Sequence, residues 1–181
     1  MRIFLFAVLL LLAGGMSAQT RMSDVLKTMP DSLCPYLSQN NRLDLVDFCE
    51  AGMKAQVTNA FDRKSELLLL TDRYASLRLS EASQVDLWLL PTADQPVLCM
   101  VTTFGTTLRE SRLSFFTAQW QLLSAAPYIT LPDYPFVATI DAAQQTLTLT
   151  SQTAFDRPAN EEQEQPQSVQ TTLNWNGEKF K

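Results

Sequence analysis

The strongest constraint on the fold is a series of short runs from Ser65 to the C-terminus, each about as long as a β-strand and separated by turn residues. In YASLRLS (74–80) small and apolar side chains alternate with polar ones, which predicts a strand with one face on a core and the other in water. VLCMVTTF (97–104) is apolar on both faces and predicts a strand that is central or covered by helix. The regular spacing of these runs predicts an antiparallel meander.

Residues 23–60 precede the strands and have a helical pattern. In NNRLDLVDFCEAGM (40–53) apolar side chains recur on one helical face and acidic ones on the other, with Asn40 or Asn41 as the expected N-cap. Helices followed by strands are typical of the α+β class. We therefore expect N-terminal helices packed on a curved antiparallel sheet, a meander of about seven to eight strands. A closed barrel capped by the helices is the alternative.

The first 18 residues have the layout of a secretory signal peptide. Arg2 supplies the positive start, the apolar run IFLFAVLLLLAGG follows, and small residues lead to an expected cleavage near Ala18. This run is shorter than the about 20 apolar residues of a membrane helix. We expect an exported chain, periplasmic or extracellular, with no transmembrane segment after cleavage. An uncleaved N-terminal anchor is the alternative.

Residues 19–181 are expected to form a single domain. Within it, a stretch at about 154–168 is polar, acidic and interrupted by two prolines (FDRPANEEQEQPQS). This composition can bury little apolar surface, so it predicts a mobile surface loop between the last two strong strands.

Composition argues against several classes of function. The formal net charge is -5, the pI is about 4.7, and no basic run is present, so the clustered Lys and Arg that bind nucleic acid or an anionic membrane surface are missing. The chain has no histidine, which removes His-activated serine and cysteine nucleophiles and most zinc sites. Its few glycines form no phosphate-binding loop. We expect no catalytic residues, no metal and no cofactor, and therefore no enzyme.

Three cysteines follow the expected cleavage point: Cys34, Cys49 and Cys99. An odd number leaves at least one of them unpaired within the chain. Cys34 and Cys49 lie in neighbouring helical segments and are the candidate disulfide, which would be worth about 3 kcal/mol through loop closure. The alternative is that all three are small buried thiols. Cys99, within an apolar strand, is expected to be a core thiol.

The segment SRLSFFTAQW (111–120) combines an arginine with three aromatic residues. On a strand, Phe115 and Phe116 point to opposite faces, as expected where each face packs on something. Trp120 follows the strand and can close the end of a core. The functional alternative is a ligand or partner groove formed by Arg112, Phe116 and Trp120 on an exposed face.

Three stretches together resemble a known family: MSDVLKTMPDSLCPYLSQNNRLDLVDF, TDRYASLRLSEASQVDLWLLP and ESRLSFFTAQW. That family consists of small exported bacterial proteins from gut and oral anaerobes and is catalogued as a domain of unknown function. The resemblance spans roughly Ser23 to Trp120. It implies an envelope location and assigns no catalytic or binding residues to the chain.

These observations favour a non-catalytic exported envelope protein that binds a protein or a glycan through an open sheet face or an edge strand. The alternative is a carrier that holds a small hydrophobic ligand in a pocket between sheet and helices. A hydrolase that uses paired carboxylates is a third hypothesis, with no spacing in the sequence to support it. A homodimer through edge strands is a further alternative for the assembly.

Overall fold

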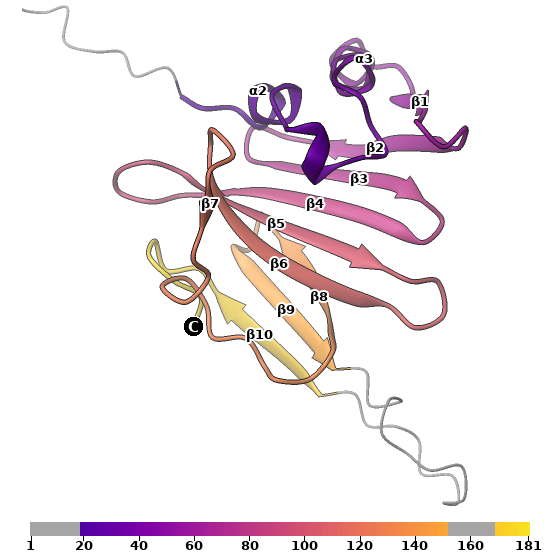
Figure 1. The fold of residues 1–181 in the computed structure, drawn as a ribbon. Helices are drawn as coiled ribbons and strands as arrows, with labels where there is room; N and C mark the ends of the chain where they lie inside the picture. Colours follow the sequence, from indigo (N-terminus) through magenta and orange to yellow (C-terminus); the bar gives the residue numbers. More distant parts are fainter. Residues whose placement is uncertain (1–18, 152–168) are drawn as a thin grey trace, which may run out of the picture.

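The computed structural model describes residues 19–151 and 169–181, so the predicted signal peptide (1–18) and the predicted polar loop (154–168) lie outside the described residues. The described chain is an α+β fold with helices first and strands after (Figure 1), as the order of the sequence patterns predicts. The helical elements are α2 (Met22–Lys27), the 3-10 helix η1 (Asp31–Leu33) and α3 (Gln39–Glu50). The strands are β1 (Gln56–Thr58), β2 (Lys64–Leu70), β3 (Tyr74–Ser80), β4 (Ser83–Leu90), β5 (Val97–Phe104), β6 (Glu110–Thr117), β7 (Leu122–Leu123), β8 (Phe136–Asp141), β9 (Thr146–Ser151) and β10 (Gln170–Asn174).

The first seven strands form one sheet in the order of the chain, and each pairs antiparallel with the next. This confirms the predicted antiparallel meander. The prediction of one sheet is incomplete, because β8, β9 and β10 form a second, three-stranded sheet. The chain leaves the first sheet after the two residues of β7, through a connection that contains Pro127, Pro132 and Pro135. Proline lacks the N–H that a sheet ladder needs, so this connection cannot continue the meander.

The seven-stranded sheet is the middle of three layers (Figure 1). The helices cover the face that carries Ala75, Leu77 and Leu79, here called the helix-side face. The three-stranded sheet packs on part of the opposite face, here called the far face, where β8 contacts β5 and β6.

The central strands β4 and β5, and the end of β6 at Phe115 and Phe116, are buried on both faces. Leu87 faces the helices and its neighbour Trp88 faces the other core, and both are at most 1% exposed. Phe116 and Phe115 divide in the same way between the two cores. The predictions of two-sided burial for 97–104 and of a split aromatic pair are therefore confirmed.

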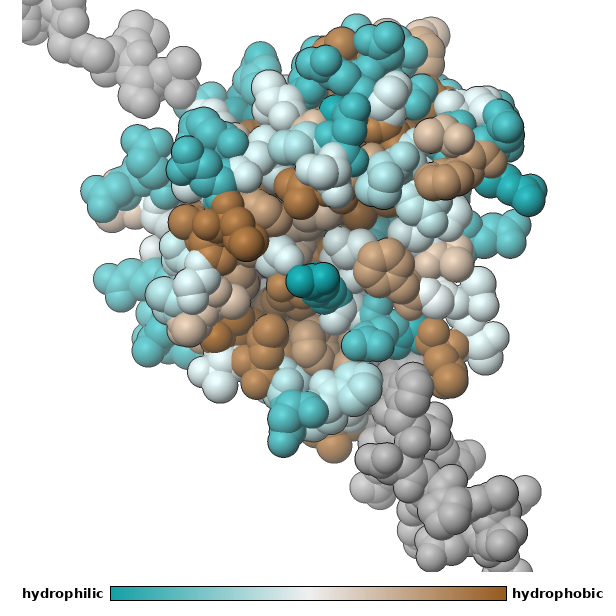
Figure 2. Space-filling view, viewed as in Figure 1, coloured by the Kyte–Doolittle hydropathy of each residue, from teal (hydrophilic) through white to brown (hydrophobic). Residues whose placement is uncertain are grey.

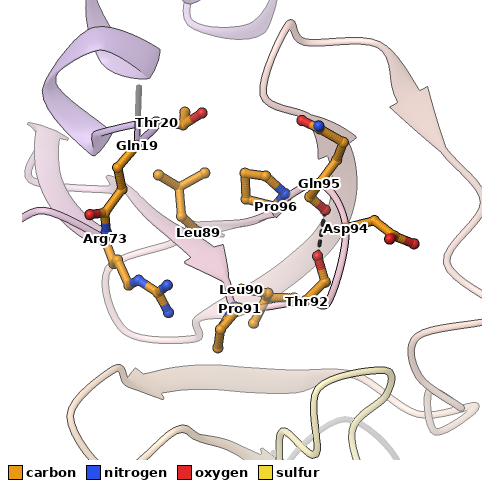
Figure 3. Close-up of a pocket in the computed structure, with 10 residues that line it drawn as sticks. All are labelled: Gln19, Thr20, Arg73, Leu89, Leu90, Pro91, Thr92, Asp94, Gln95 and Pro96. Atoms are coloured by element: carbon orange, nitrogen blue, oxygen red, sulfur yellow. Dashed lines mark hydrogen bonds between the residues drawn. The ribbon is translucent and has the colours of Figure 1, made fainter. Parts of the chain in front are cut away.

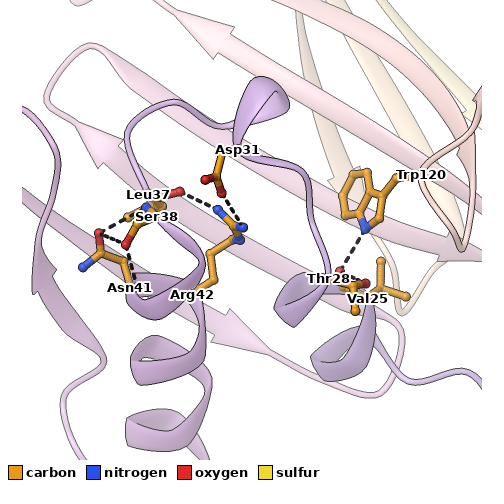
Figure 4. A network of polar contacts seen from close by, with 8 residues as sticks. All are labelled: Val25, Thr28, Asp31, Leu37, Ser38, Asn41, Arg42 and Trp120. Atoms are coloured by element: carbon orange, nitrogen blue, oxygen red, sulfur yellow. Dashed lines mark hydrogen bonds and ion pairs between the residues drawn. The ribbon is translucent and has the colours of Figure 1, made fainter.

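On the helix-side face, a tryptophan holds α2 against the sheet. Trp120 follows β6, its indole Nε1 donates to the Val25 carbonyl at 3.0 Å (Figure 4), and its ring packs 5.7 Å from that of Phe116. Its φ of 65° lies in the left-handed region, which costs a bulky residue about 1 kcal/mol or more. The buried ring and its hydrogen bond hold this backbone conformation in place.

The start of α3 is held by a buried arginine and a serine cap. Arg42, only 2% exposed, contacts Asp31 at 2.7 Å and the Leu37 carbonyl (Figure 4), so it joins η1 to the helix. Ser38 is the N-cap and forms a capping box with Asn41. The prediction of Asn40 or Asn41 as the cap was wrong, because a serine hydroxyl three residues before Asn41 bonds to its N–H.

On the far face, aromatic rings join the C-terminus to the sheet. Phe180 packs 5.8 Å from Trp88 and 5.1 Å from Trp175, whose Nε1 donates to the Pro91 carbonyl at 2.7 Å. Trp175 and Phe180 also pair across the turn that contains Gly177, whose φ is 98°. The Asn-Gly pair at the start of this turn favours such a tight hairpin. No helix in the described part of the chain is long and apolar enough to span a membrane.

Because Phe115 and Phe116 fill two different cores, each should be needed for stability. We expect Phe115→Ala and Phe116→Ala each to lower the free energy of unfolding by about 3–5 kcal/mol. Leu122→Ala, at a side chain 73% exposed, should change it by about 0.5 kcal/mol or less. Urea unfolding of the three variants measures this, and a near-neutral effect at either phenylalanine would contradict the two-core arrangement.

Candidate functional site

The far face of β1, β2 and β3 lies beyond the strands that the three-stranded sheet contacts. It carries a row of polar side chains, because Gln56 pairs with Glu66, Glu66 with Arg78, and Arg78 with Gln84 across neighbouring strands. Arg78 is 53% exposed and Lys64, on the same face, is also exposed. We call Gln56, Lys64, Glu66, Arg78 and Gln84 the open polar face.

A depression of about 700 Å³ lies over this face. The β1–β2 loop, the β3–β4 turn and Thr106 from the β5–β6 loop form its rim. Its volume is within the range of ligand sites in proteins. The charged side chains in its lining are balanced, with three acids, Asp62, Glu66 and Glu81, and three bases, Arg63, Lys64 and Arg78.

Hydrogen bonds fix the side chains beside the depression. Arg78 forms an ion pair with Glu66. On the neighbouring strand, the Gln84 amide donates to both carboxylate oxygens of Asp86, at 3.0 and 3.3 Å, and the Tyr74 hydroxyl donates to Asp86 at 2.7 Å. Asp86 is only 7% exposed, so it orients Gln84 and Tyr74 from beneath the surface.

The tyrosine of this network is a firmly protonated donor. Burial raises the pKa of Tyr74 well above its ordinary value, and the Asp86 carboxylate raises it further through its charge and its hydrogen bond. The phenol therefore keeps its proton at neutral pH.

A second hollow, of about 500 Å³, lies at the ends of the strands near β7. It is lined by residues 92–97, which run from the β4–β5 connection to the first residue of β5, by the turn at 117–119, by Tyr128 and by the C-terminal hairpin. Figure 2 shows apolar atoms gathered on the side of the molecule where β7 lies, and Leu122 of β7 is 73% exposed. This hollow can accept an apolar group more readily than the open polar face can.

A smaller pocket of about 200 Å³ shares Thr92, Asp94, Gln95 and Pro96 with that hollow. Figure 3 shows Arg73 and Asp94 on different sides of it, with the Thr92 hydroxyl bonded to the Gln95 carbonyl at 2.6 Å. The volume is below the about 300 Å³ of typical ligand sites. This pocket is therefore an extension of the 500 Å³ hollow near β7, which we call the strand-end hollow.

The structure does not bring Arg112, Phe116 and Trp120 together in an open groove. Arg112 is exposed, while Phe116 and Trp120 are 4% and 8% exposed and belong to the helix-side core. Sequence reasoning missed Glu66, Gln84 and Asp86. One signal was present, since Asp86 is the single acid in the apolar strand QVDLWLL.

All three cysteines are free thiols, so the candidate disulfide between Cys34 and Cys49 is not formed in this structure. Burial raises the pKa of Cys34 to about 11 and that of Cys99 to about 12. Cys99 is fully buried in the far-side core, and Cys49 is half-buried. Cys34 and Cys99 are thus protonated, unreactive thiols at neutral pH. Within residues 19–151 and 169–181, no group of three acidic or cysteine side chains is placed to hold a metal ion.

Comparison with known proteins identifies a family and a fold. Residues 13–175 match the model of a family described as Protein of unknown function (DUF3256). The chain is also similar to the structure of a domain of an uncharacterized protein from Porphyromonas gingivalis W83, with a TM-score of 0.73 and 19% sequence identity, over 88% of this chain and 96% of that one. At this identity the likeness concerns the fold alone. No curated protein matches the chain. The resemblance to an uncharacterised family that includes oral anaerobes is confirmed.

The burial of the cysteines predicts their reactivity. In native protein purified without reductant, we expect one thiol per chain, Cys49, to react quickly with a disulfide reagent at pH 8, and three to react after unfolding. A single reactive thiol after unfolding would instead indicate an oxidised Cys34–Cys49 pair.

The raised pKa values of Cys34 and Cys99 also predict how stability depends on pH. In the folded chain both pKa values lie above the ordinary 9.0, so these thiols lose their protons at a lower pH in the unfolded chain than in the folded one. The free energy of unfolding should therefore fall as pH rises above about 9.

Proposed function

The chain belongs to the DUF3256 family of proteins of unknown function, and we propose that it is a non-catalytic exported protein that binds a protein or a glycan of the cell envelope through its open polar face. The export step rests on the signal peptide expected at residues 1–18, with cleavage near Ala18.

One observation carries this proposal: the far face of β1 to β3 is recessed and lined by polar side chains, and none of the described elements forms a layer over it. Sheets of this kind bury one face and keep the other in water, so a wet face alone would not indicate a site. Here the wet face is hollowed, and an ion pair and a buried carboxylate hold its side chains in defined positions. Side chains that are already ordered lose less entropy when a partner binds.

A photocrosslinking amino acid placed at position 106 tests the proposal in the cells that make the protein. Thr106, on the exposed rim of the depression, is replaced by p-benzoylphenylalanine, which leaves the open polar face intact, and we expect adducts of one defined additional mass after illumination. Arg112 is the control position, because it is also exposed on the same sheet but lies on the opposite face.

Adducts at both positions, or at neither, would contradict a role for the open polar face. An adduct of twice the chain mass at position 106 would identify a second copy of the chain as the partner.

The strand-end hollow supports a second candidate function, the carriage of a small hydrophobic ligand. The apolar side chains between helices and sheet pack as the helix-side core, and the hollow lined by residues 92–97 and Tyr128 is an apolar recess that favours this role. We expect a carrier to retain a small mass in native mass spectrometry. Ala93→Trp, which fills the hollow, should release it, and a bare chain in both samples would argue against carriage.

A further inference from the structure

We propose that the ligand of the open polar face is a neutral oligosaccharide. This inference rests on the proposed function, since it names the class of partner that the same surface would bind.

The charge of the depression favours a neutral ligand. The chain as a whole carries a formal net charge of -5, yet the acids and bases that line the depression are equal in number. A site with balanced charge gives a charged ligand no net attraction to offset the loss of its hydration. Neutral polar ligands do not have this cost.

The hydrogen-bonding groups of this face match hydroxyl groups. Across three adjacent strands the row presents an acceptor, Glu66, a donor, Arg78, and a second acceptor, the amide oxygen of Gln84, whose N–H groups donate to Asp86. Adjacent strands are about 4.8 Å apart, close to the width of a sugar ring. A sugar hydroxyl donates and accepts at once, so neighbouring hydroxyls can use alternating donors and acceptors.

The row is also held in place before any ligand binds. Glu66 fixes Arg78 through the ion pair, and Asp86 fixes the amide of Gln84 from below. Leu69, 50% exposed, pairs with Ser76 at the next same-face position along β2 and β3 and adds an apolar surface beside the row for the C–H side of a sugar ring.

A protein partner fits the depression less well. Protein interfaces depend on a few buried anchors, mostly Trp, Tyr and Arg packed in apolar pockets. Ala82 is the one apolar residue, and no aromatic residue is present, in the described lining of this depression. The described lining therefore offers many hydrogen-bonding groups and no large apolar side chain, which suits a polyhydroxylated ligand.

The test uses the full chain after removal of its first 18 residues and a panel of oligosaccharides. The neutral members are oligomers of glucose, galactose, mannose and N-acetylglucosamine, and the charged members are sialylated and sulfated oligomers. We expect at least one neutral member to bind, with an affinity that changes little with salt concentration. Glu66→Gln and Arg78→Met should each weaken it about tenfold or more, because each removes a charged hydrogen-bonding partner.

Arg112→Met is the matched control and should leave the affinity unchanged, since Arg112 lies on the opposite face. Circular dichroism of each variant shows whether it is folded, and Glu66→Gln preserves the shape of the side chain if Arg78→Met does not fold.

Three results would overturn the inference: no binding by any neutral member, preference for the charged members, or binding that both open-face variants leave intact. A protein adduct at position 106 together with no glycan binding would overturn the ligand class and leave the interaction role standing.

Discussion

The burial of β4, β5 and the Phe115–Phe116 end of β6 on both faces is the constraint on which the rest of the structure depends. Successive side chains on a strand point to opposite faces, so a segment that is apolar on both faces needs a packed layer on each side. The helices supply one layer over Leu87 and Phe116, and the three-stranded sheet with the C-terminal hairpin supplies the other over Trp88 and Phe115. That second layer packs on β5 and β6, and none of the described elements forms a layer over the polar far face of β1 to β3.

Each outer layer is joined to the central sheet by a tryptophan. Trp120 reaches α2 and Trp175 reaches the end of β4, and each indole N–H donates to a backbone carbonyl far away in the sequence. A buried indole needs a partner for its N–H, so each contact sets both the position of the ring and the approach of its layer. The ring of Trp120, just after β6, packs in the helix-side core, and the ring of Trp175, just after β10, packs in the core on the far face.

The alternation of apolar and polar residues in the sequence predicted the features that depend on neighbouring residues alone, such as the face of a strand on which a side chain lies. Alternation in 74–80 predicts correctly which side chains of β3 face the core, and Arg78 could be placed on the wet face from sequence alone. The departure of β8 to a second sheet depends on contacts between distant segments, which periodicity does not record. The segment 111–120 was expected to be mainly core, and the groove at Arg112, Phe116 and Trp120, its alternative, is not formed, because the indole of Trp120 packs against α2 and is buried. Asp86 was missed because its partner Tyr74 lies on β3, and only the pairing of β3 with β4 brings the two side chains together.

Amide hydrogen exchange tests the central role of β4 to β6 most directly. Amides buried beneath layers on both sides should exchange only when the whole chain unfolds. We predict that the amides of β4, β5 and β6 are the slowest in the protein, and that α2 and β10 exchange faster through local opening. Equal or greater protection in β8 to β10 would contradict the account, because it would make the three-stranded sheet an independent core.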